Sequence, residues 1–198
     1  SIAGSTFGSG PGGMVSVTAS EELSISGHSE QTVDIGSSLT VVNTPTTIVA
    51  IATGTGRAGA ITVNTPRLTM FDGGQILTST GGDGPAGSIT INAGSMNVSS
   101  GASISSTSGF DVGVNGGFQI GNGAGGTVTV NASGPVTIAD QGSGLFTTTA
   151  GNGVGGNINL RGSGIQLSNG AAISATSSGR GNAGNITVNA GNQFTMMN

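Results

Sequence analysis

The sequence predicts an all-β protein: a right-handed parallel β-helix of about six coils, each with three short strands in a unit of about 28 residues. Three observations lead to this fold class. A motif of the form Gly-x-Ile-Thr-Val recurs along the chain. Apolar and polar residues alternate inside each copy, which is the period of a half-buried strand. A recurring unit of this length is typical of a solenoid.

The repeat length follows from the glycine that opens each copy of the motif. These glycines are Gly13, Gly59, Gly87, Gly126, Gly156 and Gly184. Successive glycines are 46, 28, 39, 30 and 28 residues apart, so the basic period is 28 residues and the longer intervals contain insertions. The chain, residues 1–198, is therefore expected to be a single array, cut from a longer one, with insertions at 26–47 and 110–121.

The first predicted strand of each coil follows the motif glycine directly. Its inward positions form two aliphatic columns. The first column is Val15, Ile61, Ile89, Val128, Ile158 and Ile186, and the second is Val17, Val63, Ile91, Val130, Leu160 and Val188. Between them lies an outward polar column of Ser16, Thr62, Thr90, Thr129, Asn159 and Thr187. Equivalent positions with equivalent chemistry predict strands that stack on one another.

Two further strands complete each coil. A second alternating run begins nine or ten residues after the glycine, for example with Leu68 and Met70. The third strand is anchored by an aliphatic residue in every copy, namely Ile2, Ile48, Ile76, Ile104, Leu145 and Ile173. One coil cannot bury its inner face alone, so coils must stack, at about 4.8 Å per coil. The handedness of parallel crossovers predicts right-handed coiling.

Composition limits the classes of function. Charged residues make up 6% of the chain, and the net charge is −4. Stacked like charges repel, whereas amides and hydroxyls can hydrogen-bond along a column. The residue after the first strand fits this rule, because it is Asn64, Asn92, Asn131 or Asn189 in four copies and Arg161 in one. The four arginines form no basic stripe for nucleic acid, and no apolar stretch is long enough for a membrane span.

Turn residues recur at fixed offsets. Asp72-Gly73 and Asn169-Gly170 follow the second strand at equivalent positions and predict turns. The forty glycines are expected either in turns with positive φ or where backbones approach closely.

The first insertion contains the only histidine, His28, with Glu30 and Asp34. These residue types can form an acid/base pair or a cation site. The favoured alternative is a solvated excursion with a small extra hairpin, since loops on a scaffold tolerate charge. Acid/base catalysis also needs two groups in defined geometry, which the spacing does not supply. No catalytic residue, metal site or cofactor is predicted.

The second insertion places Phe110, Asp111 and Phe118 in a glycine-rich frame. Two of the six phenylalanines of the chain lie here. The segment is predicted either as an exposed recognition loop or as a loop folded over the face of the helix. Its phenylalanines make it the better candidate of the two insertions for a contact patch.

Three segments carry a resemblance to a known family. They read Gly-Ser-Ile-Thr-Ile-Asn-Ala-Gly at 87–94, Ser-Asn-Gly-Ala-Ala-Ile-Ser-Ala at 168–175 and Gly-Arg-Gly-Asn-Ala-Gly-Asn-Ile-Thr-Val-Asn-Ala-Gly at 179–191. This pattern resembles the repeat region of filamentous-haemagglutinin-like exoproteins, β-helical proteins exported by two-partner secretion. The resemblance implies an extracellular or outer-cell-surface protein, as an adhesin, surface fibre, biofilm component or toxin-bearing stalk. The Asn-Pro motifs of that family's secretion domain are not present, so the resemblance places this segment downstream of that domain.

Several functions fit this fold, and the sequence favours one. We expect a structural or adhesive shaft of a secreted or cell-surface fibrous protein, without catalysis, that contacts a host or neighbouring-cell surface or a matrix polysaccharide or protein. The alternative is a subunit that stacks end to end with copies of itself, since open coil ends present unpaired backbone groups. Less favoured are ice binding through the outward threonines, which Asn159 interrupts, and a polysaccharide-active enzyme, which needs an acidic groove that the scattered aspartates do not supply.

Overall fold

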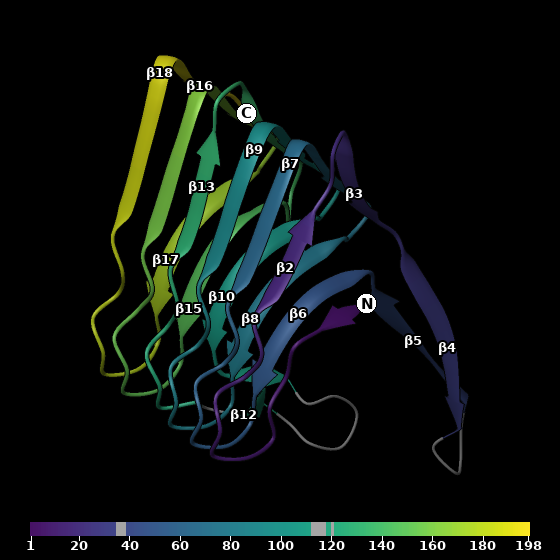
Figure 1. The fold of residues 1–198 in the computed structure, drawn as a ribbon, viewed down its shortest axis with the longest axis vertical. Coiled ribbons are helices and arrows are strands. Elements are labelled where there is room, and N and C mark those ends of the chain that lie inside the picture. The colour runs from purple at the N-terminus through teal and green to yellow at the C-terminus, as the bar shows by residue number, and fades with distance from the viewer. Residues whose placement is uncertain (35–38, 112–117, 120) are drawn as a thin grey trace.

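The computed structural model describes residues 1–34, 39–111, 118–119 and 121–198. Every regular element among these residues is a β-strand (Figure 1). Most strands belong to two parallel sheets. The wider sheet contains β2 (Val15–Thr18), β3 (Glu22–Ser26), β7 (Ile61–Phe71), β9 (Ile89–Val98), β13 (Val128–Ala132), β14 (Val136–Ala139), β16 (Ile158–Ser168) and β18 (Ile186–Met196). The second sheet contains β1 (Ile2–Ala3), β6 (Thr47–Ala52), β8 (Gln75–Thr80), β10 (Ser103–Ser108), β15 (Gly144–Thr149) and β17 (Ala172–Ser177).

Strands pair with the equivalent strands of the neighbouring repeats. Ile89 lies opposite Ile61 on one side and Val128 on the other, and all of these pairings are parallel. In the second sheet, Ile104 lies between Ile76 and Leu145 in the same way. Figure 1 shows the result as strands of each sheet laid side by side in the order of the chain. This arrangement is consistent with a β-solenoid.

The first and second predicted strands of a repeat are continuous in four of the six repeats, which differs from the expected three short strands. They form the single strands β7, β9, β16 and β18, and remain separate only as β2 with β3 and as β13 with β14. A corner replaces the expected gap. In β9, Ile89, Ile91 and Ala93 are buried at intervals of two, and the next buried residue, Met96, follows after three. Backbone pairing runs on through this corner, because Thr65 pairs with Ala93 and Arg67 pairs with Ser95.

The predicted inward columns form the core between the sheets. The core side chains of the three central repeats are buried to 98% or more, namely Ile61, Val63, Leu68, Met70 and Ile76, then Ile89, Ile91, Met96, Val98 and Ile104, then Val128, Val130, Val136, Ile138 and Leu145. The predicted inward and outward registers of all three strands are therefore confirmed in these repeats.

Part of the interior is lined by hydroxyl groups rather than by hydrocarbon. Thr78, Ser106 and Thr147 occupy one inward column of the second sheet and are fully buried. The Thr78 hydroxyl donates to the Gly87 carbonyl at 2.6 Å, and the Thr147 hydroxyl donates to the Gly156 carbonyl at 2.7 Å. These bonds give carbonyl groups of the glycine-rich turn hydrogen-bond partners inside the fold, as buried polar groups require.

Five of the six motif glycines, all except Gly13, are required by close backbone approach to the preceding repeat. A Cβ atom on Gly87 would lie 1.9 Å from the carbonyl oxygen of Gly59 in the preceding repeat. Positive φ is confined to other positions. Asp72 and Gly73 have φ of 50° and 73°, and Asn169 and Gly170 have φ of 55° and 82°, so the predicted turns after the second strand are confirmed.

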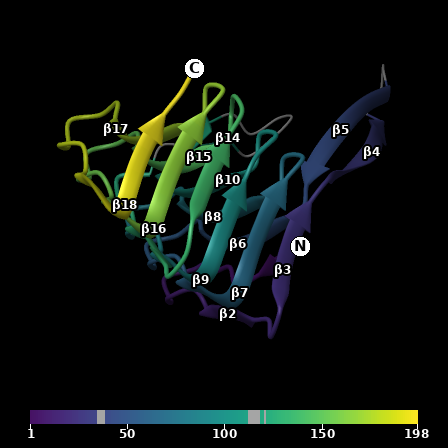
Figure 2. The same cartoon turned by 90° about the horizontal axis from the view of Figure 1, so that it is seen from above.

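Both insertions contain short antiparallel pairs. β4 (His28–Asp34) and β5 (Leu39–Pro45) form a hairpin within the first insertion, from His28 opposite Pro45 to Asp34 opposite Leu39. Figures 1 and 2 show this hairpin extending away from the two sheets. β11 (Phe110–Asp111) and β12 (Phe118–Gln119) pair within the second insertion. The expected small extra hairpin of the first insertion is therefore confirmed.

Candidate functional site

The outer side of the wide sheet carries the predicted polar column. Thr62, Thr90 and Thr129 are cross-strand neighbours in β7, β9 and β13. Asn159 of β16 and Thr187 of β18 continue the column in register. All five residues are partly or fully exposed, while the flanking aliphatic residues of the central strands are buried. The column therefore presents one hydroxyl or amide per strand, at the inter-strand spacing of about 4.8 Å.

A ladder of asparagines runs beside this column. The Asn92 side-chain amide donates to Asn64 Oδ1 at 2.9 Å, and the Asn131 amide donates to Asn92 Oδ1 at 3.1 Å. Arg161 occupies the next position and pairs through its backbone with Asn131 and Asn189. The asparagine ladder that the sequence predicts is thus present, and it stops at the arginine.

Arg161 is exposed, and its charged partners differ from those of Arg67, an arginine at an earlier corner of the wide sheet. Arg67 Nη1 lies 3.7 Å from Glu22 Oε2, and the Thr69 hydroxyl donates to the same carboxylate at 2.6 Å. Among the residues that the structure describes, Arg161 has no carboxylate within salt-bridge distance and no side-chain hydrogen bond. Its guanidinium therefore retains its hydrogen-bond donors for a ligand.

The surface beside Arg161 is hollowed. An open hollow of about 590 Å³ is lined by residues of three successive repeats, including Asn92, Gly94, Asn131, Ser133 and Arg161. A second hollow of about 350 Å³ continues it past Arg161 and is lined by Ser133, Arg161, Ser163, Asn189 and Gly191, among others. Arg161 and Ser133 line both hollows. We call this combined surface the corner groove, because it follows the corner of the wide sheet from β9 to β18.

Part of the lining of the corner groove consists of small residues at one fixed offset. Gly94, Ser133, Ser163 and Gly191 each follow their motif glycine by seven residues. Small side chains at a corner leave space that larger side chains would fill. These residues were not predicted from the sequence as part of a site. Their constant offset from the motif glycine is the signal that could have identified them.

Two of the residues predicted in the first insertion, His28 and Glu30, lie on the hairpin strand β4. Both are exposed, and they lie opposite Pro45 and Asn43 of β5. The side chain of Asp34 lies outside the described residues. Within the described part of the chain, no group of three His, Cys, Asp or Glu residues is placed to hold a metal ion. The exposed position of His28 and Glu30 agrees with the favoured alternative of a solvated hairpin.

The second insertion begins against the outer side of the second sheet. Ser79 of β8 is fully buried although it points outward, and its hydroxyl donates to the Gly109 carbonyl at 3.4 Å. Phe110 pairs with Gln119, and Asp111 with Phe118. The side chains of Phe110, Asp111 and Phe118 lie outside the described residues, so the prediction of a contact patch is not tested there.

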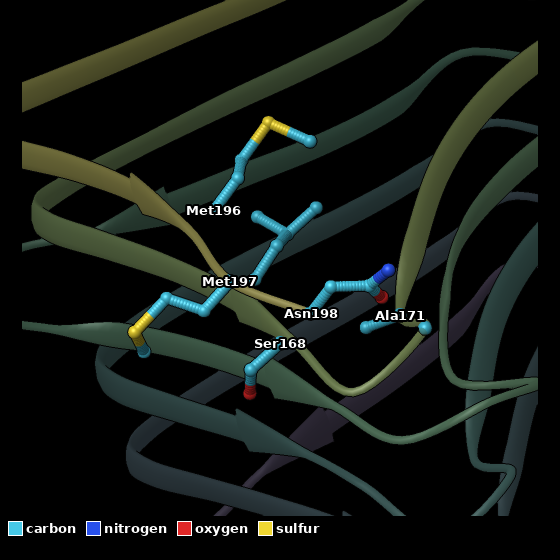
Figure 3. Close-up of a pocket in the computed structure, with 7 residues that line it drawn as sticks. Ser168, Ala171, Met196, Met197 and Asn198 are labelled. Atoms are coloured by element: carbon cyan, nitrogen blue, oxygen red, sulfur yellow. The ribbon is translucent and has the colours of Figure 1, made fainter.

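Each end of the array exposes side chains that would be inward in a central repeat. Phe194 and Met196 of β18 are 46% and 69% exposed. Figure 3 shows Met196 and Met197 beside a hollow of about 200 Å³ that also borders Ser168 and Ala171. At the other end, Ile2 is 50% exposed. Both ends of the array therefore present apolar side chains at the surface.

Comparison with known proteins adds no assignment: no family model matches the chain, and no similar curated protein or solved structure was found. The described residues also contain no helix with the length and apolarity needed to cross a membrane. The function must therefore be argued from the surfaces described above.

Proposed function

We propose that this chain is a length of right-handed parallel β-helix that serves as a structural or adhesive shaft of a secreted or cell-surface fibrous protein. The likeness of its repeats to those of filamentous-haemagglutinin-like exoproteins supports this class. The shaft holds many equivalent polar groups in line, so that weak contacts act together and gain strength through multivalency.

One observation carries the proposal, namely the unbroken register of equivalent residues from repeat to repeat. Thr62, Thr90 and Thr129 remain aligned although the intervals between their repeats are 28 and 39 residues. Alignment that survives an insertion means that the strands and the turns common to every repeat set the docking, and that the inserted loop does not. A structure built in this way can be lengthened indefinitely, which is the property that a shaft needs.

The test is to measure how length depends on the number of repeats. The chain alone and a tandem fusion of two copies, joined so that the repeat period continues from Met196 to Ile2, would be examined by small-angle X-ray scattering. A shaft predicts that the fusion has twice the length at the same cross-section. Two globular particles joined by a flexible segment, or an expanded chain, would contradict the proposal. A fusion that breaks the period with a glycine–serine linker is the matched control.

The exposed end repeats favour a second candidate, a subunit that assembles end to end. Head-to-tail contacts that do not close into a ring generate filaments. Negative-stain electron microscopy across a concentration series would show fibrils that lengthen with concentration, and Phe194→Asp should shorten them. Rods of one length at every concentration would exclude this candidate without affecting the first.

A further inference from the structure

We propose that the corner groove binds an acidic polysaccharide, with Arg161 holding one carboxylate of a uronic acid residue. This inference rests on the proposed shaft function, because it names a partner for one surface of that shaft. The groove is defined by two adjoining hollows of about 590 and 350 Å³, and Arg161 lines both.

The first step concerns the charge. Arg161 stands where an asparagine would continue the ladder, and the other described members of the ladder are uncharged. Among the described residues, the Asn131 side-chain oxygen therefore receives no ladder bond from the next repeat, unlike the oxygens of Asn64 and Asn92. The described residues place no carboxylate beside Arg161, in contrast to the Arg67–Glu22 pair at 3.7 Å. A planar guanidinium with free donors recognises a carboxylate through two parallel hydrogen bonds.

The second step concerns the surroundings of that charge. Asn92 and Asn131 line the groove on one side of Arg161, and Asn189 lines it on the other. Amides and hydroxyls are both donors and acceptors, which suits the hydroxyl groups of a sugar. Among the described residues that line the groove there is no aromatic or large aliphatic side chain of the kind that anchors protein partners. These features favour a saccharide over a peptide.

The third step concerns length and charge density. The groove crosses β9, β13, β16 and β18, which are separated by three inter-strand spacings of about 4.8 Å each. Each spacing is close to the advance of one linked pyranose ring, so a short oligosaccharide can follow the groove. One arginine in this length matches a polymer with a single carboxylate at the centre and hydroxyls on either side. It does not match a polyphosphate, which requires a row of cations.

The experiment measures binding of a neutral xylo-oligosaccharide that carries one glucuronate substituent to the whole chain by isothermal titration calorimetry at low salt. Three probes are compared: the acid, its methyl ester, which has the same shape without charge, and tetraglutamate as an acidic peptide. The acid is expected to bind, and both other probes are expected to bind at least about tenfold more weakly, since a hydrogen bond to a charged group is worth this factor or more.

Two matched variants distinguish binding in the groove from attraction by the net charge of the protein. Arg161→Gln and Arg180→Gln change the net charge equally, and Arg180 is an exposed arginine outside the groove. Arg161→Gln should lose about tenfold or more in affinity, whereas Arg180→Gln should retain the wild-type value. Arg161→Lys should fall between the two, because lysine keeps the charge but not the planar fork.

Four results would overturn the inference: no binding of the acid, equal binding of the ester, equal binding of tetraglutamate, or equal losses for Arg161→Gln and Arg180→Gln. Scattering curves from the same samples keep the two proposals apart. A rod that binds no uronate refutes the polysaccharide site alone, whereas a particle that is not a rod refutes the shaft.

Discussion

Substitution of a motif glycine tests whether the repeats are stacked as closely as the structure requires. In Gly87→Ala, the new methyl group would lie 1.9 Å from the Gly59 carbonyl oxygen, where ordinary contact begins near 3.4 Å. The two repeats would have to separate by about 1.5 Å at this point. The atom in the way belongs to the backbone, so no side chain can swing aside to relieve the overlap.

The expected cost follows from the bonds that this separation disturbs. The Ile61 amide donates to the Ser88 carbonyl at 2.9 Å, and the Thr78 hydroxyl donates to the Gly87 carbonyl at 2.6 Å. Overpacking a close contact costs about 1–3 kcal/mol, and each weakened hydrogen bond adds about 1 kcal/mol. We therefore expect Gly87→Ala to lower the free energy of unfolding by about 3–5 kcal/mol.

The same column contains its own control. A Cβ atom on Gly13, at the equivalent position in the first repeat, meets no atom within 4 Å. Gly13→Ala should therefore change stability by less than about 0.5 kcal/mol. Urea unfolding followed by far-ultraviolet circular dichroism measures both variants, and hydrogen exchange locates the repeats that open. Equal destabilisation of the two variants, or none in Gly87→Ala, would refute close stacking as the reason for the glycines.

Three further predictions concern the core, the buried hydroxyls and a surface ion pair. Ile91→Ala removes most of a fully buried side chain and should cost about 2–5 kcal/mol in a urea titration; a cost below 1 kcal/mol would mean that this column is not packed. Thr78→Val should cost only about 1 kcal/mol, because the Gly87 carbonyl also accepts from Ser106 at 3.0 Å. Adding Ser106→Ala should cost more than the sum of the single changes, and a double-mutant cycle that shows strict additivity would contradict this shared acceptor. Arg67→Gln should cost less than about 1 kcal/mol in thermal unfolding, because the side chains of the Arg67–Glu22 pair are 65% and 40% exposed; a larger loss would show that this pair holds the first repeats together.

The period and the alternation of the sequence were sufficient to predict which residues pair. Ile61, Ile89 and Val128 fall in one column because the backbone ladder repeats with the motif. The continuity of β9 through Gly94 was not predictable in this way, since glycine and serine are found at turns as well as at corners. The deciding factor is backbone pairing between repeats, which is a non-local property.

The candidate site was predictable only in part. Arg161 is visible in the sequence as the exception in an asparagine position, but the hollow beside it depends on the corner and on the small residues of three repeats. The hydroxyl column of Thr78, Ser106 and Thr147 was missed for a related reason. The alternation of residues predicts that these three side chains point inward. Their hydroxyl groups can be buried there because they donate to turn carbonyls, which only the folded chain brings within hydrogen-bond distance.

The hairpin of the first insertion shows where this architecture accepts new sequence. The strands on either side of it keep their partners, since Ile25 lies opposite Met70 and Ile48 lies opposite Ile76, as if the intervening hairpin were absent. The turn between the two sheets therefore accepts a hairpin without a change in strand register, and the base of the hairpin stays bonded to the next repeat, because the Gly27 amide donates to the Asp72 carbonyl and the Gln75 amide donates to the Thr46 carbonyl. Such a turn lets surface appendages diversify while the stack beneath them is conserved, and it gives an engineer a defined place to graft a foreign loop.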